Sequence, residues 1–300
     1  MHKNFFEVND LISEYLQSGK PFSCLRIDNT SGYVMHCLHN HILPSSEFYN
    51  PYTLIEGGVT PSSIQYGFDV VYKRTIEEMK RCDILGFVDV SGEIKRDSNF
   101  LSQFPNSSKF FDFWIMDPGS LLGLSPFGNL ANPWSQSLAG KKVLVVSSHA
   151  NTIKQQWEKI DLIWGENRSK IAPFELVDAI STPYHPAIDD RQYPNCNDFE
   201  TLVQITKDRI DQYDYDVLLT GVTTQSPFYA EHAKQRGKVG IQTGGTIQLF
   251  FGILGSRWVH GAPYAKWHSM FNEHWIYPLE IDKPQRKASI NFLETSYAYW

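Results

Sequence analysis

The feature that most constrains the fold is a regular alternation of short apolar runs with amphipathic segments in the second half of the chain. Four runs of strand type occur there: "KKVLVVSS" (141–148), "FELVDAI" (174–180), "DVLLTG" (216–221) and "KVGIQT" (238–243). Segments with helical apolar spacing separate them, at 149–165, 199–213 and 224–237. Strands that alternate with helices predict a parallel sheet covered on both faces. The expected fold class is therefore α/β, with a Rossmann-like, mostly parallel sheet.

The first part of the chain predicts the same kinds of element less regularly. Helical spacing occurs at 4–19, 31–43 and 60–82, and strand-type runs occur at 21–28 and 83–90. Residues 95–135 are rich in aromatic residues, Pro and Gly, which predicts a long functional loop with short helices. No linker separates independent units, so we expect a single domain over residues 1–300. The alternative is a division into parts 1–130 and 131–300.

Charge and apolar content exclude several classes of protein. The net charge is -6, which argues against a sequence-independent grip on nucleic acid, because that needs a basic face. The acids Glu7 and Asp10 interrupt the first apolar run, so no signal peptide is expected, and no run reaches the roughly 18–20 apolar residues of a membrane span. The four cysteines form no C-x-x-C pair, which is typical of free thiols in a reducing compartment. We expect a cytoplasmic protein, and the sequence does not indicate its oligomeric state.

Polar segments follow three of the predicted strands: "SSHANT" (147–152), "TGVTTQS" (220–226) and "QTGGT" (242–246). Ligands of open parallel sheets bind beyond the carboxyl ends of the strands, and helix N-termini favour anions. These segments therefore predict a site for a phosphate-bearing ligand, although the same glycines also suit ordinary turn geometry. The residues assigned to this ligand are His149, Asn151, Lys154, Gly221, Thr223, Thr224, Gln242, Gly244, Gly245 and Thr246. For Lys154 the alternative is plain surface charge.

Common catalytic fingerprints are absent from the sequence. It contains no G-x-x-x-x-G-K-[ST], no G-x-G-x-x-G after a strand and no G-x-S-x-G elbow. This argues against a P-loop nucleotidase, an ordinary dinucleotide enzyme and an α/β-hydrolase. The run "HCLHNH" (36–41) puts His36 and His39 on one helical face, but no second ligand cluster follows. A solvated helix face is therefore favoured over a metal site.

Three long runs carry a family resemblance. They are "NPWSQSLAGKKVLVVSSHANTIKQQWEKI" (132–160), "YDVLLTGVTTQSPFYAEHAKQRGKVGIQTGGTIQLFFGILGSRW" (215–258) and "FNEHWIYPLEIDKP" (271–284), with the terminal "YAYW". They resemble a family of proteins from bacterial surface-polysaccharide clusters and large viruses, which is itself similar to glycosyltransferases of the GT-D fold. The resemblance covers most of 130–300 and, more weakly, 20–90. It implies transfer of a sugar from a nucleotide-sugar donor (UDP-, GDP- or CDP-linked) to a glycan acceptor in surface polysaccharide or glycoprotein glycan synthesis.

One departure from this family concerns the metal. GT-D enzymes carry R-x-G-D-x-E after an early strand, and its two carboxylates serve diphosphate binding through a metal ion. Here that place reads "LRIDNTSG", in which Arg26 matches the arginine but either alignment leaves at most one acid, Asp28. We therefore expect no metal site and no required cofactor, with only modest stimulation by Mg²⁺ or Mn²⁺. Arg26 and Asn29 stay candidates for donor binding, and a local salt bridge or turn cap is the alternative for Arg26 and Asp28.

The remaining polar candidates concern catalysis and the acceptor. Asp28, Glu56 in a glycine loop and Asp117 among aromatic residues are candidates for the base that deprotonates the acceptor hydroxyl. Glu273, flanked by Trp267 and Trp275, suggests a wall for sugar stacking, and ordinary aromatic core is the alternative for either tryptophan. The predicted function is a nucleotide-sugar-dependent glycosyltransferase. The alternatives are a non-catalytic nucleotide- or glycan-binding protein, or an acyl or phosphoryl transferase of the same pathway.

Overall fold

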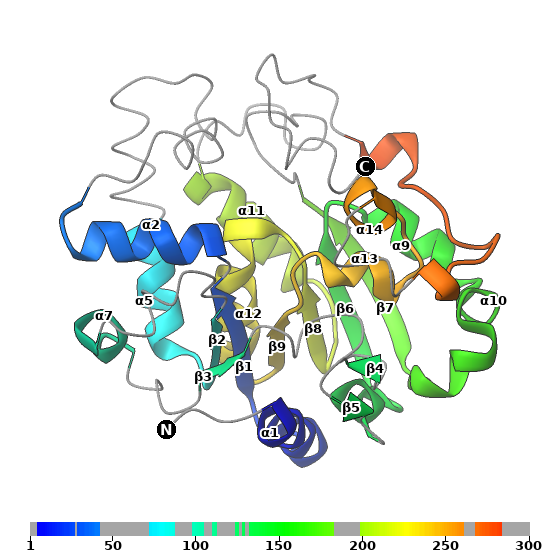
Figure 1. The fold of residues 1–300 in the computed structure, drawn as a ribbon, viewed down its shortest axis with the longest axis horizontal. Helices are drawn as coiled ribbons and strands as arrows, with labels where there is room; N and C mark the ends of the chain where they lie inside the picture. The colour runs from blue at the N-terminus through cyan, green and yellow to red at the C-terminus, as the bar shows by residue number, and fades with distance from the viewer. Residues whose placement is uncertain are drawn as a thin grey trace.

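The centre of the protein is a seven-stranded sheet in the order β3-β2-β1-β9-β8-β6-β7, in which all the neighbouring strands are parallel (Figure 1). We describe it from a computed structural model that covers residues 5–27, 29–42, 72–87, 98–104, 110–112, 124–125, 128–129, 132–182, 199–260 and 268–283. The strands are β1 (Phe22–Ile27), β2 (Ile84–Phe87), β3 (Phe110–Asp112), β6 (Lys142–Ser147), β7 (Glu175–Ser181), β8 (Val217–Thr220) and β9 (Val239–Gln242). A short antiparallel pair, β4 (Leu124–Ser125) and β5 (Gly128–Asn129), lies apart from this sheet. The α/β, Rossmann-like prediction is confirmed.

Helices cover both faces of the sheet because successive strand residues point to opposite sides. Val143 and Val145 of β6 belong to one apolar cluster, whereas Leu144 and Val146 belong to another. The first face carries α1 (Phe5–Ser18), α9 (Ala150–Trp157), α10 (Ile160–Trp164), α13 (Thr246–Phe250) and α14 (Ser256–His260). The second carries α2 (Asn29–His39), α5 (Lys73–Arg81), α7 (Ser98–Ser102), α11 (Phe199–Ile210) and α12 (Ser226–Gln235). The described residues also include short 3-10 helices, among them η5 (Trp134–Leu138), η6 (Gly165–Lys170), η7 (Thr223–Gln225) and η9 (Glu280–Asp282).

Two elements differ from the sequence-based predictions. Residues 95–135 were expected to form only a loop with short helices, but β3 within them is an edge strand of the main sheet. A single helix was expected over 149–165, and the structure has two, because Lys159 leaves the helical conformation (φ -115°, ψ 14°). The apolar stripe that suggested one helix is still buried on both, at Ile153 and Trp164. Of the helix predicted at 60–82, the described part is α5.

The described residues agree with two further expectations. Cys24, Cys37 and Cys82 are buried and form no disulfide. Among the described helices, none is both long and apolar enough to cross a bilayer. The solvated helix face expected for His36 and His39 is not fully solvated, since both imidazole rings pack edge-on against Phe100 of α7.

Candidate functional site

The carboxyl ends of β1 and β9 form the point at which the chain leaves the sheet in opposite directions. α2 follows β1 to one side, whereas α13 and α14 follow β9 to the other (Figure 1). Main-chain pairing between the two strands ends at Cys24 and Ile241, and beyond it the N–H of Arg26 donates to Oε1 of Gln242 at 3.1 Å. In open parallel sheets this switch point is where the ligand crevice lies. Arg26 and Gln242, both predicted to bind the ligand, lie together there.

The backbone of Gly244 explains the first of the two glycines after β9. Its φ is +63°, a left-handed conformation that side chains disfavour, and a Cβ at this position would lie 2.6 Å from Cζ of Arg26. The glycine therefore makes room for the guanidinium of the protein's own arginine, where the sequence had suggested close approach of a ligand. The hydroxyls of the turn bind within it, since Thr246 Oγ1 donates to the Thr243 carbonyl at 2.7 Å.

The loop after β8 packs against this turn. A Cβ on Gly221 would lie 2.7 Å from the carbonyl oxygen of Gly244, so the two loops touch at their glycines. Ser226 Oγ accepts from the N–H of Val222 at 2.8 Å, and this closes the loop on the start of α12. The predicted residue Thr224 is half-buried in this loop. The side chains of Thr223 and Asn29 lie outside the described part of the structure.

The N-terminus of α9 is occupied by a carboxylate of the chain itself. Asp282 is fully buried, and its Oδ2 accepts from the N–H and the hydroxyl of Thr152 at 2.7 and 2.6 Å. Its Oδ1 accepts from the side-chain amide of Asn151 at 2.8 Å. Free N–H groups at a helix start attract anions, and here Asp282 satisfies them. Asn151, predicted to bind the ligand, is thus engaged by Asp282.

His149 is the N-cap residue of α9 and lies in a buried polar chain. Its Nδ1 is 3.3 Å from Oγ of Ser148, and its Nε2 is 3.3 Å from the amide nitrogen of Gln248 in α13. Oε1 of Gln248 in turn accepts from the indole N–H of Trp258 at 3.0 Å. The predicted residue His149 therefore lies at the carboxyl edge of the sheet, beside the turn that contains Gly244.

Lys154 lies further along α9 and points to the edge strand β7. Its ammonium forms an ion pair with Asp178 at 2.5 Å, and the hydroxyl of Tyr213 donates to the same carboxylate. Burial raises the pKa of Asp178, but the hydrogen bonds from Lys154 and Tyr213 outweigh this and hold its pKa below the usual range. The ion pair accounts for Lys154 without a diphosphate, as the surface-charge alternative had it.

The residues predicted to bind the acceptor have different placements. Trp275 is 6% exposed, packs edge-on against Trp164 and donates its indole N–H to the Ile163 carbonyl. A ring that stacks on sugar needs an open face, so this placement fits the core alternative and not the predicted wall. Glu273 is exposed, with its carboxylate 3.7 Å from the His274 ring. Trp267 lies outside the described residues.

The predicted catalytic carboxylates, Asp28, Glu56 and Asp117, also lie outside the described residues, so their roles stay predictions. Within the described ranges, no group of three or more His, Cys, Asp or Glu side chains is placed to hold a metal ion.

The structure adds four residues that sequence reasoning did not single out: Ser148, Gln248, Trp258 and Asp282. Ser148 and Asp282 stand in runs that were quoted for other reasons, "SSHANT" and "PLEIDKP". Apart from the adjacent pair Ser148 and His149, the partners of these residues lie on other elements, so spacing carries no signal of those contacts.

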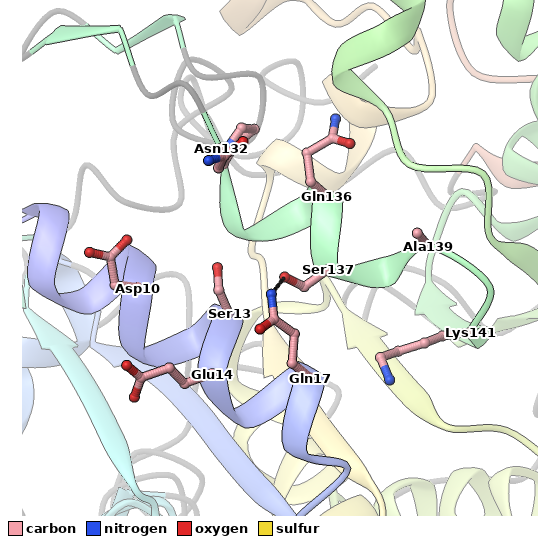
Figure 2. Close-up of a pocket in the computed structure, with 10 residues that line it drawn as sticks. Asp10, Ser13, Glu14, Gln17, Asn132, Gln136, Ser137, Ala139 and Lys141 are labelled. Carbon is pink, nitrogen blue, oxygen red and sulfur yellow. Dashed lines mark hydrogen bonds between the residues drawn. The ribbon is translucent and has the colours of Figure 1, made fainter.

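A groove of about 620 Å³ lies elsewhere, between α1 and the segment that precedes β6 (Figure 2). Asp10, Ser13, Glu14 and Gln17 line it from α1, and the Gln17 amide donates to the Ser137 hydroxyl across it. Both bordering segments lead into the amino ends of strands, so the groove is at the opposite edge of the sheet from Arg26. Two carboxylates against one ammonium, Lys141, do not suit a diphosphate.

Comparison with known proteins finds fold likeness only. No protein-family model matches the chain, and no curated protein matches it. Among solved structures the chain is similar to a new glycosyltransferase (DUF1792) from Streptococcus sanguinis, at 11% identity over 91% of this chain and 94% of that one, with a TM-score of 0.44. It is also similar to a selenomethionine-substituted domain of unknown function 1792, at 12% identity over 94% and 92% of the two chains, with a TM-score of 0.45. The function below is therefore argued from the residues of this chain.

Proposed function

We propose that this protein is a glycosyltransferase that binds the diphosphate of a nucleotide-sugar donor in the crevice between the ends of β1 and β9. The observation that carries the proposal is Arg26, which sits at the switch point of the sheet with its guanidinium against the main chain of Gly244. A guanidinium recognises phosphate oxygens through paired N–H donors, and here its position is fixed by packing. The sequence resemblance to glycosyltransferases supports the same class.

In the proposed reaction, an acceptor hydroxyl oxygen attacks the anomeric carbon of the donor sugar. The bond from that carbon to the diphosphate oxygen breaks, and the diphosphate leaves with the bonding electrons. Arg26 offsets the charge that develops on it, and a carboxylate takes the proton of the acceptor hydroxyl. Asp28, Glu56 and Asp117 are the proposed sources of that carboxylate.

We further propose that a divalent metal is not required. Mg²⁺ and Mn²⁺ in such sites are held by carboxylates together with phosphate oxygens, and the segment after β1 supplies one acid, Asp28, where two are needed. A fixed positive charge at Arg26 takes over part of the role of the metal. Transfer is expected to survive EDTA, with modest stimulation by added Mn²⁺.

The first test measures binding and turnover separately. UDP, GDP or CDP at saturating concentration should raise the melting temperature, because a ligand that binds only the folded state stabilises it. Arg26→Ala should weaken that binding more than tenfold, since a charge-assisted hydrogen bond contributes about 1.5–3 kcal/mol. Arg168→Ala, which removes a half-buried arginine paired with Asp161, is the matched control and should bind as the wild type does.

Turnover is then followed as release of nucleoside diphosphate from nucleotide-sugars, with and without EDTA. A panel that gives neither a thermal shift nor turnover would refute the proposal. Binding without turnover would favour the non-catalytic alternative. Loss of turnover in EDTA that Mn²⁺ restores would refute metal independence, and Glu56→Gln and Asp117→Asn would then identify the second carboxylate.

A further inference from the structure

A chain of four buried polar side chains lies at the carboxyl edge of the sheet, and we infer that it has a fixed direction that ends in a hydrogen-bond donor for the ligand. The members are Trp258 of α14, Gln248 of α13, and His149 and Ser148 in the turn after β6. Each side chain is at most 3% exposed. The inference deepens the proposed function, on which it rests only for the identity of the ligand.

The direction is set at Trp258. An indole N–H only donates, so the atom of Gln248 that faces it at 3.0 Å must be the amide oxygen. The NH₂ group of the same amide then faces Nε2 of His149 at 3.3 Å. Because that group only donates, Nε2 must accept and carries no proton. In a neutral imidazole the proton is therefore on Nδ1.

The tautomer of His149 determines whether Ser148 donates or accepts. Nδ1–H of His149 faces Oγ of Ser148 at 3.3 Å and donates to it. A hydroxyl that accepts this bond keeps its own proton for another acceptor. With the opposite tautomer, Ser148 would have to donate to Nδ1 and would have no proton left to offer. The indole of Trp258 thus decides, through two intervening side chains, that Ser148 is a donor.

The ligand of the proposed function would supply the acceptor for this proton. Ser148 directly follows the carboxyl end of β6. One short turn of chain connects the two parts of this edge, because Gly244 contacts Arg26 and Gln248, four residues later, contacts His149. We assign Ser148 as a donor to an anionic oxygen of the leaving diphosphate. Trp258, Gln248 and His149 are positioning residues, and Nε2 of His149 is not available as a general base.

The first test reads the tautomer without any substrate. In protein with ¹⁵N-labelled histidine rings, His149 is identified as the signal that the His149→Asn variant lacks. We expect an unprotonated Nε2 and a protonated Nδ1 in the wild type. Gln248→Met removes the amide donor, so a population with Nε2–H should appear. A wild-type ring protonated at Nε2 would overturn the inference, whether or not turnover has been found.

The second test is a double-mutant cycle on turnover. Ser148→Ala should lower kcat about tenfold and change KM less than twofold, because its bond strengthens as charge develops on the diphosphate. Gln248→Met should lower kcat at least threefold in the wild-type background and have no further effect in the Ser148→Ala background. Equal losses of kcat in both backgrounds would show that Gln248 acts only through packing, which contradicts the inference.

Two further points keep the test decisive. Should Gln248→Met not fold, Trp258→Phe removes the indole N–H but keeps an aromatic side chain, which frees the Gln248 amide to rotate, with the same expected change in tautomer. A protein that turns over none of the nucleotide-sugars fails the proposed function, whereas the ring signals of His149 still decide the direction of the chain.

Discussion

Gly244 carries two constraints at a single residue. Its backbone is left-handed, and the space that a side chain would fill is taken by Arg26. The sequence identifies the glycine pair as a close approach of backbone to something charged. It does not identify the charged group as an arginine that lies far earlier in the chain.

Gly244→Ala is expected to lower the free energy of unfolding by about 1–3 kcal/mol, because alanine is strained in this conformation and its methyl group displaces the guanidinium. The same displacement should weaken binding of UDP, GDP or CDP. Gly245→Ala is the matched control, since Gly245 has a φ of -63°, which any residue adopts. Urea unfolding of both variants checks the prediction, and equal stability of the two would contradict it.

Glu231 is a second residue with an unusual environment. It lies on α12 with 1% of its surface exposed and accepts a hydrogen bond from the Ser23 hydroxyl of β1. Burial raises the pKa of this carboxyl, and the hydrogen bond from Ser23 only partly offsets the effect. Folding therefore favours the protonated form of Glu231.

The sign of the pH effect follows from this shift. The contribution of Glu231 to stability is fully present below its ordinary pKa of about 4.5 and is lost as the pH rises through the raised, folded-state value. Glu231→Gln keeps a neutral acceptor for Ser23, so its advantage over the wild type should grow from about pH 4 to about pH 8. Urea unfolding at several pH values measures it, with the exposed Glu166→Gln as control. An advantage that does not change with pH would rule out a shifted Glu231.

At the scale of elements, α9 shows that a sequence motif can be present and yet serve a different role from the one it suggested. Its first turn has the small and polar residues of an anion site, and an anion does bind there. That anion is Asp282, held by groups from Asn151 and Thr152, and Leu279 adds a main-chain bond to the Thr152 hydroxyl. The segment 279–283 is thereby fastened to the helix.

Asp282→Asn should destabilise the protein by about 1–3 kcal/mol, because an amide has only one acceptor oxygen for the donors that the carboxylate now satisfies. Asp161→Asn, at an aspartate whose side chain is 78% exposed and paired with Arg168, should change stability far less. Chemical unfolding of the two variants gives the comparison. Similar losses from both would show that the contacts of Asp282 contribute little.

At the scale of the whole molecule, periodicity predicted most of the elements and the class of the sheet, but not which segments contact one another. The runs that became β6, β7, β8 and β9 were all visible, because buried parallel strands are continuous apolar runs. β3 was missed because three residues within an aromatic loop are too few to show a period. The break between α9 and α10 was missed because both helices bury the same apolar stripe.

The place of the site stays a prediction, and two of the residues assigned to it, Asn151 and Lys154, are engaged by carboxylates of the protein itself. The rule for parallel sheets predicted a ligand at the carboxyl edge of the sheet, where Arg26, Gln242 and His149 lie. It did not reveal that Asp282 fills one helix N-terminus or that Lys154 pairs with Asp178. Those contacts join segments that only the folded chain brings together, so no local pattern encodes them.

The pairing of β1 with β9 has a consequence for the order in which the molecule assembles. Phe22 lies beside Val239, so the central seam of the sheet joins chain segments made at very different times during synthesis. Such distant contacts close late, because the entropy of a long loop must be overcome first. Arg26 and Gly244 stand on the two sides of this seam, so the proposed donor site is expected to form only when the seam closes. A nucleotide that binds there would act as a clamp on that seam, and a newly made chain would gain its binding activity and its full resistance to unfolding at the same moment.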